Sequence, residues 1–431
     1  MRRYESYKDS GVERLGKVPS HWEILSIRRL SQVKRGASPR PIDNPKYFDD
    51  DGEYAWVRIS DVTASNMYLL ETTQKLSNLG KSYSVPLMPG SLFLSIAGSV
   101  GKPIITKIKV CIHDGFVYFP EYKQNTKFLY YIFYSEQPYI GLGKMGTQLN
   151  LNTDTVGAIK IPIPPLSEQQ KIAQFLDDKT AKIDQAVDLA EKQIALLKEH
   201  KQILIQNAVT RGLNPDAPLK DSGVEWIGQV PEHWEVKKLK FVSKINQHTL
   251  PENTNGSLSI KYVDIGSVSF ENGIEKVENF SFKNAPSRAR RLANRGDIVV
   301  STVRTYLKAI TMVKEEHQDC IFSTGFAVIT SNKCLEDNFF ELYAKSDAFT
   351  EQVSVFSKGM SYPAINSTDL SNLWITVPPI SEQQKIADYL EIQVSKINQA
   401  IALKTAHIEK LKEYKSVLIN DVVTGKVQVS V

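Results

Sequence analysis

Two long stretches of the chain carry an apolar pattern that repeats every seven residues. The first spans residues 167–210, which contain no proline or glycine, and the second lies 214 residues further on. A heptad pattern kept over about six repeats is typical of helices that pair in a coiled coil. The pattern predicts a seam formed by Leu176, Ile183, Val187, Ile194, Leu197 and Leu204 in the first helix and by Leu390, Ile397, Ile401, Ile408, Leu411 and Leu418 in the second.

The seam and the helix start carry further local signals. Ser167-Glu-Gln-Gln170 follows two prolines and predicts a capping box in the first helical turn. Three lysines interrupt the seam and are expected to mark local gaps or hydrated points: Lys201, Lys404 and Lys415. An alternative is that each helix packs only on its own globular domain, although two equal helices in one chain most simply pair with each other.

Short β-type runs broken by turns precede each long helix. Before the first helix they lie at 54–59, 91–96, 103–106 and 116–119. Before the second helix they lie at 260–265, 297–301, 309–313 and 326–329. The pattern therefore predicts an α+β fold with two globular domains separated by two long helices.

Whole motifs recur along with this pattern. Residues 9–23 return as 221–235, an offset of 212, and residues 164–173 return as 378–387, an offset of 214. Units of this size are far longer than solenoid repeats, which recur every ~20–50 residues. The chain is therefore expected to hold two domains of one design and to do one job at two places.

The order of these pieces predicts a cyclic topology. Segment 221–235 follows the first helix, whereas its twin has no helix before it, so the second helix should run back antiparallel and end beside the N-terminus. The two halves would then be related by a pseudo-two-fold axis. Helices of about 44 residues span about 65 Å and would hold the globular modules at opposite ends. The expected divisions are a first module with the closing N-terminal segment (1–165), a first spacer helix (166–212), a second module (213–379), a second spacer helix (380–425) and a tail (426–431).

Composition changes this picture little. The three cysteines of the 431-residue chain lack ligand spacing and the seven histidines form no cluster, so no metal site is expected. The chain shows neither a signal peptide nor an apolar run long enough for a membrane span, and a cytoplasmic protein is expected. A net charge of +5 permits a nucleic-acid partner without requiring one.

Catalytic motifs are poor. Residues 98–102 contain a glycine-lysine step without phosphate-loop spacing, and Asn44-Pro-Lys-Tyr47 lacks the second proline of an amino-methyltransferase pocket. His21 and His233 lie in the duplicated Pro-x-His-Trp-Glu motif, where packing or a hydrogen bond is the expected role. No catalytic residue is assigned.

Residues suited to DNA binding are better represented. Arginine forks suit guanine edges and phosphates, lysines suit phosphates, and Gln or Asn can read adenine. The candidates of the first module are Lys34, Arg35, Ser38, Arg40, Lys46, Arg58, Lys102, Gln148 and Asn150. Those of the second are Arg288, Arg290, Arg291, Arg304, Tyr306, Lys308, Ser361 and Tyr362. A solvated surface is the alternative for any single residue, but similar frameworks with dissimilar polar loops favour recognition of two different targets.

Taken together, these motifs resemble the specificity subunit of type I restriction-modification systems. The resemblance is carried by the Ser-Glu-Gln-Gln-Lys-Ile-Ala helix starts at Ser167 and Ser381, by the duplicated segments ending at Glu23 and Glu235, and by the glycine loops before each helix. It covers essentially the whole chain. The recognition loops of the family vary freely, so the DNA-binding candidates come from chemistry and position alone.

The resemblance implies a non-catalytic subunit. Each module would be a target-recognition domain that reads one half of a bipartite sequence in double-stranded DNA, and the helices would set the spacing between the halves. The helices and their ends would dock two methylation subunits, which carry S-adenosylmethionine and methylate adenine N6. Restriction subunits would add ATP- and Mg²⁺-dependent translocation and cleavage, so this chain needs no cofactor of its own. The alternatives are a coiled-coil scaffold that binds only proteins and an autonomous adenine methyltransferase.

Overall fold

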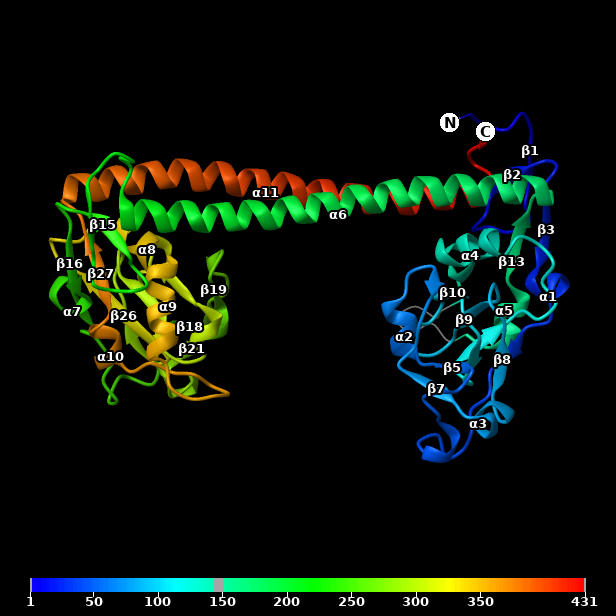
Figure 1. Ribbon diagram of the computed structural model, residues 1–431, viewed down its shortest axis with the longest axis horizontal. Coiled ribbons are helices and arrows are strands. Elements are labelled where there is room, and N and C mark those ends of the chain that lie inside the picture. The colour runs from blue at the N-terminus through cyan, green and yellow to red at the C-terminus, as the bar shows by residue number, and fades with distance from the viewer. Residues whose placement is uncertain (1, 143–150, 430–431) are drawn as a thin grey trace. The chain divides into compact units, whose positions relative to one another are not determined.

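The computed structural model describes residues 2–142 and 151–429. The chain forms two compact units, shown in Figure 1. Unit 1 comprises Met1–Ala190 and Ala406–Val431, and unit 2 comprises Glu191–Thr405. Each unit therefore contains a globular part and a portion of both long helices.

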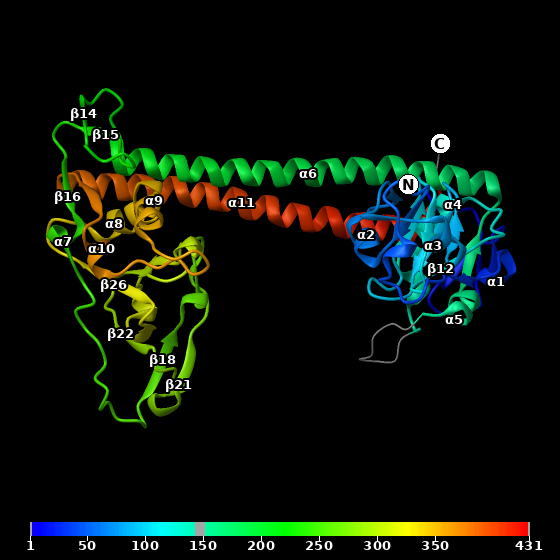
Figure 2. The same ribbon diagram turned by 60° about the horizontal axis from the view of Figure 1, so that its bottom comes forward.

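The long helices are α6 (Leu166–Arg211) and α11 (Ile380–Val423). They lie side by side in Figures 1 and 2. Within unit 2, the Lys201 ammonium lies 3.2 Å from Asn398 Oδ1 and the Lys404 ammonium lies 2.6 Å from Gln193 Oε1. Residue numbers fall along one helix as they rise along the other, which confirms the predicted antiparallel pair.

The predicted seam residues are all buried or half-buried, some of them also against the globular part of their unit. Leu176, Leu390 and Leu418 are among the most enclosed, at 0%, 0% and 3% exposure. The seam lysines are not gaps, because each ammonium bonds to the opposite helix; in unit 1, Lys415 Nζ lies 2.7 Å from Asp184 Oδ1. Polar partners thus accommodate the lysines without breaking the seam.

The predicted capping box is wrong. Helix α6 begins at Leu166, and the amides of Glu168 and Gln169 donate to the Pro165 carbonyl. Ser167 therefore lies inside the first turn and is not the N-cap. Gln169 is fully buried, and its amide donates to the Pro164 carbonyl at 2.8 Å. In unit 2, Gln383 makes the same bond to the Pro378 carbonyl at 2.7 Å. The recurring glutamine therefore fixes the turn from strand to helix in both units.

Unit 1 contains two main sheets, in the strand orders β4-β12-β9-β10-β6 and β7-β5-β11-β8. Its strands are β1 (Tyr7–Asp9), β2 (Lys17–Pro19), β3 (Glu23–Ser26), β4 (Lys34–Arg35), β5 (Tyr54–Val57), β6 (Tyr68–Leu69), β7 (Gln74–Leu76), β8 (Val85–Leu87), β9 (Leu92–Ser95), β10 (Pro103–Thr106), β11 (Val110–Ile112), β12 (Phe116–Tyr118) and β13 (Lys160–Ile163). Its short helices are α1 (Ile27–Leu30), α2 (Ile59–Ala64), α3 (Asn78–Ser82), α4 (Thr126–Tyr134) and α5 (Thr153–Ala158).

Unit 2 repeats this plan with sheets in the orders β17-β26-β23-β24 and β21-β18-β25-β22. Its strands are β14 (Leu219–Asp221), β15 (Gln229–Pro231), β16 (Glu235–Lys238), β17 (Ser243–Ile245), β18 (Ser259–Val263), β19 (Val268–Ser269), β20 (Gly273–Ile274), β21 (Glu278–Ser281), β22 (Ala289–Leu292), β23 (Ile298–Ser301), β24 (Ile310–Met312), β25 (Cys320–Ser323), β26 (Phe326–Ser331) and β27 (Trp374–Val377). Its short helices are α7 (Leu239–Val242), α8 (Asp337–Ala344), α9 (Asp347–Phe356) and α10 (Ser367–Ser371).

The strand register shows which residues correspond between the units. Parallel strands β5 and β11 place Val57 opposite Ile112, and parallel strands β18 and β25 place Val263 opposite Phe322. The turn 113–115 of unit 1 therefore corresponds to 323–325 of unit 2. These turns, together with the turns of the β9-β10 and β23-β24 hairpins, position the polar groups described below.

The N-terminal segment closes unit 1 as predicted. Arg2 and Gln428 form a β-bridge, and the Gln428 amide donates to the Arg2 carbonyl at 2.8 Å. Buried Trp22 packs at the end of α11, where a Cβ added to Gly425 would lie 3.1 Å from its ring. The end of the second helix thus lies beside the N-terminus.

The duplicated Pro-x-His-Trp-Glu motif ties each closing segment to a long helix. His21 Nε2 lies 2.9 Å from a Glu168 carboxylate oxygen in unit 1, and His233 Nε2 lies 2.9 Å from Glu382 in unit 2. These contacts confirm the hydrogen-bonding role expected for the histidines. Among the described residues, no helix is long and apolar enough to cross a membrane.

Candidate nucleic-acid interface

In unit 1, segment 36–40 crosses the turn 113–115 at close range. A Cβ at Gly36 would lie 2.2 Å from the His113 carbonyl oxygen, so only glycine permits this approach. The Gly36 amide donates to the Phe116 carbonyl at 2.9 Å. This crossing brings candidate residues of β4 and the following loop beside a turn almost 80 residues further along the chain.

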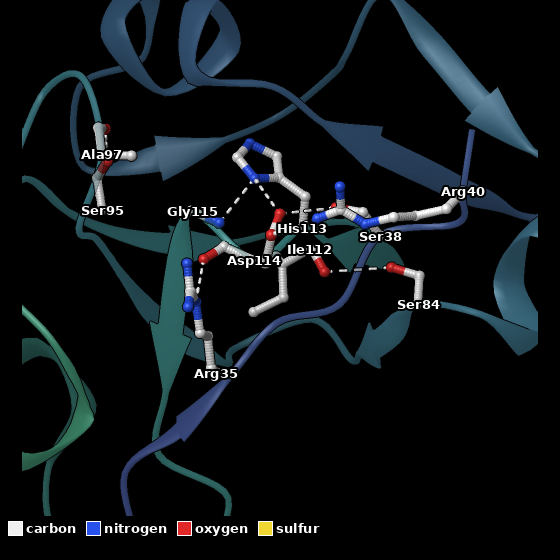
Figure 3. A network of polar contacts seen from close by, with 10 residues as sticks. All are labelled: Arg35, Ser38, Arg40, Ser84, Ser95, Ala97, Ile112, His113, Asp114 and Gly115. Atoms are coloured by element: carbon white, nitrogen blue, oxygen red, sulfur yellow. Dashed lines mark hydrogen bonds and ion pairs between the residues drawn. The ribbon is translucent and has the colours of Figure 1, made fainter. Parts of the chain in front are cut away.

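Three candidates converge on Asp114, as Figure 3 shows. Ser38 Oγ donates to Asp114 Oδ1 at 2.8 Å, and Arg40 Nη2 donates to Asp114 Oδ2 at 3.2 Å. Arg35 Nε donates to the Asp114 backbone carbonyl. The Ser38 hydrogen bond is the main reason why the pKa of Asp114 is lowered, so this carboxylate is charged at neutral pH.

His113 stands beside this cluster and is largely enclosed. Its ring centroid lies 4.5 Å from that of Phe116 and 5.8 Å from that of Trp56. Its Nδ1 accepts from the Gly115 amide at 2.8 Å, which requires the neutral ring. Burial lowers the pKa of His113, and the charges of Arg35 and Arg58 lower it further against the opposing effect of Asp114.

The remaining described candidates of unit 1 differ in their accessibility. Lys34, Lys46 and Arg58 are exposed. Lys102 instead donates to the Thr63 carbonyl at 3.0 Å, and burial lowers its pKa. Gln148 and Asn150 lie outside the described residues. Unit 1 therefore offers a central arginine cluster with exposed basic residues on the same module, whereas Lys102 is engaged by the protein itself.

Unit 2 builds its basic site on different contacts. The Arg304 guanidinium carbon lies 5.2 Å from the ring centroid of Tyr362, a cation–π arrangement. A bridge between Val303 and Ala364 joins segments 302–305 and 358–364, and a bridge between Lys358 and Ala364 closes the second segment on itself. These bridges bring two candidate loops together, and Tyr306, Ser361 and Tyr362 are all exposed there.

The backbone of this loop is unusual. Arg304 and Lys308 have left-handed conformations with φ of 52° and 47°. Such positions are costly for residues other than glycine and concentrate at functional sites. Lys308 Nζ donates to Thr350 Oγ1 at 3.1 Å and lies 3.8 Å from the Glu351 carboxylate, so it is held against α9.

The structure separates the arginines of segment 288–291. The Arg288 carbonyl accepts from the Thr324 amide at 2.8 Å, which places exposed Arg288 at the turn that corresponds to the Asp114 turn. Arg290 stacks over Phe282, with 4.7 Å between its guanidinium carbon and the ring centroid. Arg291 Nη1 bonds Thr249 Oγ1 at 3.2 Å, and burial lowers its pKa. Arg288 is therefore the most available of the three.

Asp114 is absent from the DNA-binding candidates predicted from the sequence, which are basic, hydroxyl or amide residues. An acidic residue in a glycine-flanked turn was the only local signal. Its partners lie 74 and 76 residues earlier in the sequence. Among residues 2–142 and 151–429, no group of His, Cys, Asp and Glu side chains is arranged to hold a metal ion.

Sequence comparison finds relatives over most of the chain. Residues 19–198 and 231–413 each match the type I restriction modification DNA specificity domain. The chain is 25% identical to the putative type I restriction enzyme MjaX specificity subunit of Methanocaldococcus jannaschii, with 98% of each protein covered. It is 22% identical to the EcoKI specificity subunit of Escherichia coli, with 87% of this chain and 82% of that protein covered.

Solved structures share the fold. One comes from a study of complex assembly and conformational transition in the type I R-M system, with a TM-score of 0.73, 17% identity and coverage of 95% of this chain and 99% of that chain. The HsdS subunit from Thermoanaerobacter tengcongensis gives a TM-score of 0.55 at 17% identity, with 95% and 98% coverage. With a matching domain in each half and specificity subunits as full-length relatives, the chain belongs to the family of type I restriction-modification specificity subunits.

Proposed function

We propose that this chain recognises a bipartite sequence in double-stranded DNA, with each unit reading one half. The observation that carries the proposal is the contrast at corresponding edges of the two units. Their sheets follow one plan, yet unit 1 presents Arg40 on a carboxylate, whereas unit 2 presents Arg304 on an aromatic ring. Shared frameworks with different arginine supports suit two readers of different base sequences.

The long helices are proposed to set the distance between the half-sites. Each is continuous, and their pairing is held by apolar seam residues and by lysine bonds across the seam. A paired helix is stiff along its axis, at about 1.5 Å per residue. The length of the helix pair can therefore fix the number of base pairs between the two half-sites.

Apolar side chains on the outside of the helices support docking of two methylation subunits. Leu189, Leu196 and Ile203 recur at seven-residue intervals on α6 and are 57%, 63% and 50% exposed. Leu403 of α11, which stands 214 residues after Leu189, is 72% exposed. Exposed apolar residues in register are a common mark of a protein-binding face. The double variant Leu196→Glu, Leu403→Glu places charges on this apolar surface and should abolish co-purification with methylation subunits. Glu199→Gln, on the exposed surface of the same helix, should not.

In the proposed complex this chain is non-catalytic and acts in the cytoplasm. S-adenosylmethionine would be bound by the methylation subunits, and ATP with Mg²⁺ by the restriction subunits. The described residues provide the arginine clusters for DNA and the helix surfaces for protein partners. Recognition and catalysis are thus assigned to different subunits.

The proposal that the helices set the distance between the half-sites is tested by lengthening both helices. Four residues inserted after Lys192 and four after Ala406 add about 6 Å to each helix, against about 3.4 Å per base pair of DNA. The insertion is a stutter that locally unwinds a coiled coil, so both helices must be changed together. The double insertion should keep both half-site sequences and move the optimal gap by up to about two base pairs.

Binding to duplexes whose gap varies one base pair at a time gives the readout, and the methylated motif in cells gives a second. An unchanged optimum in a folded, active variant would leave the helices only a docking role. A chain that binds no duplex at low salt, alone or with methylation subunits, would favour a protein-binding scaffold. Binding of S-adenosylmethionine by the isolated chain would favour an autonomous methyltransferase.

A further inference from the structure

Asp114 is the shared acceptor of the unit 1 cluster, yet it is accessible enough to lie at a DNA interface. Its side chain is 38% exposed, and that of Arg40 is 80% exposed. The pair therefore lies at the surface rather than in the core. A single ion pair of this exposure contributes little to stability, typically about 0–1 kcal/mol, so stability alone is a weak reason for the arrangement.

The geometry of the pair leaves Arg40 able to bind a second group. A guanidinium has five N–H donors in a rigid fork, and the contact with Asp114 occupies only Nη2. In the major groove, guanine O6 and N7 accept hydrogen bonds from two parallel N–H donors such as those of a guanidinium. Fixing the fork before binding reduces the side-chain freedom that is lost when DNA binds.

Asp114 is itself held in place. Its Oδ1 accepts from Ser38, while the Arg35 side chain holds its backbone carbonyl. The tight crossing at Gly36 fixes the segment that carries Ser38 and Arg40 against the same turn. The carboxylate therefore joins segment 36–40 to the turn 113–115, and Figure 3 shows Ser38 and Arg40 beside Asp114.

We propose that Asp114 is a specificity-determining positioning residue, which orients Arg40 to read a guanine, so that the half-site of unit 1 contains a G·C pair. This inference rests on the proposed function, because it needs unit 1 to contact DNA. Unit 2 has Thr324 at the corresponding position, and Arg304 is oriented there by Tyr362. The effect of Asp114 should therefore be confined to one half-site.

The test uses the full chain co-expressed with its methylation subunits, with genome-wide mapping of methylated adenines as the readout. Asp114→Asn replaces a charged acceptor by an amide of the same size and should relax the motif at one G·C pair. The preference for G·C over other base pairs at that position should fall by about 5- to 150-fold, the range expected for one bidentate arginine–guanine contact. Asp43→Asn is the matched control, since Asp43 is exposed three residues after Arg40 and the charge change is identical.

A double variant shows whether Asp114 acts through Arg40. Arg40→Ala should relax the same base pair, and Asp114→Asn should add nothing further in that background. Ser38→Ala, which leaves the carboxylate in place but removes its hydrogen bond, should give a smaller loss at the same pair. This variant keeps the test informative if Asp114→Asn disturbs folding.

The outcomes separate the inference from the proposed function. A motif that relaxes in Arg40→Ala but keeps full stringency in folded Asp114→Asn and Ser38→Ala would overturn the positioning role and leave the proposed function intact. Relaxation at an A·T pair would overturn the guanine assignment. Unchanged motif and affinity in folded Arg35→Ala, Arg40→Ala and Arg58→Ala would remove this surface from DNA recognition, and with it the proposed reading role of unit 1.

Discussion

The two units each place an arginine near a corresponding turn, 113–115 or 323–325, but from different loops and on different supports. In unit 1 the fork of Arg40 is held by Asp114, a charged hydrogen bond with a defined direction. In unit 2 the guanidinium of Arg304 lies over the ring of Tyr362, a contact made with the ring face. A carboxylate fixes the direction in which the guanidinium group points, whereas an aromatic ring fixes the plane of the guanidinium group. The comparison indicates that one framework can serve two recognition chemistries by changing the support.

The hairpin turns beside these sites differ in backbone as well. Ser95 Oγ bonds the Ala97 carbonyl, and Ser301 Oγ bonds the Val303 carbonyl, so the next positions correspond. They are Gly98 with φ of 65° and Arg304 with φ of 52°. Unit 1 uses glycine at this left-handed position, while unit 2 accepts strain in order to place an arginine there.

The largest expected effect comes from exchanging a whole module. Replacing residues 220–375 by the second module of another family member should change one half of the recognised sequence completely and leave the other half unaltered, because the core of each unit is built separately. Mapping of methylated adenines measures the result. A change in both halves would refute independent reading.

The next largest effect is expected from replacing Arg40 or Arg304 one at a time. Arg40→Ala and Arg304→Ala should each weaken DNA binding by about 1–3 kcal/mol if the fork meets a base edge. Each variant should relax only the half-site of its own unit. A phosphate contact would instead lower the salt slope by about one and spare specificity. Titration of duplexes at several salt concentrations separates these outcomes.

A smaller effect is expected from the aromatic support of unit 2. Tyr362→Leu removes the ring under Arg304 and should cost about 0.5–1 kcal/mol of binding, the usual strength of an exposed cation–π contact. Tyr362→Phe keeps the ring and is the matched control. Loss of binding in both variants would show that the hydroxyl, rather than the ring face, makes the contact.

The smallest effect is the pH response of His113 in unit 1. Its folded pKa is lowered, so the unfolded chain binds more protons as the pH falls below the ordinary histidine value. Stability from this group is present at pH 7 and above and is lost as the pH falls through the unfolded pKa of about 6.5 toward the lower folded value. His113→Gln should therefore show a smaller decrease in the melting temperature of unit 1 between pH 7 and 5. An equal decrease in both proteins would assign the response to other groups.

The sequence by itself determined the features that repeat. A seven-residue apolar period is visible in one dimension, and it identified the helices, their antiparallel pairing and the seam. The duplicated segments predicted the closure beside the N-terminus, which the Arg2–Gln428 bridge confirms. These features follow from local periodicity and chain order, so they need no knowledge of distant contacts.

Only the tertiary structure decided which polar residues meet. Ser38 and Arg40 reach Asp114 because β4 pairs with β12 and Gly36 crosses the turn that precedes it, contacts that no local pattern encodes. Tertiary structure also made the capping box wrong, since the helix begins at Leu166, one residue before Ser167, and the amides of Glu168 and Gln169 donate to the Pro165 carbonyl. A polar side chain takes whichever partner the folded chain brings within hydrogen-bonding distance, and that choice depends on the packing of strands far apart in sequence.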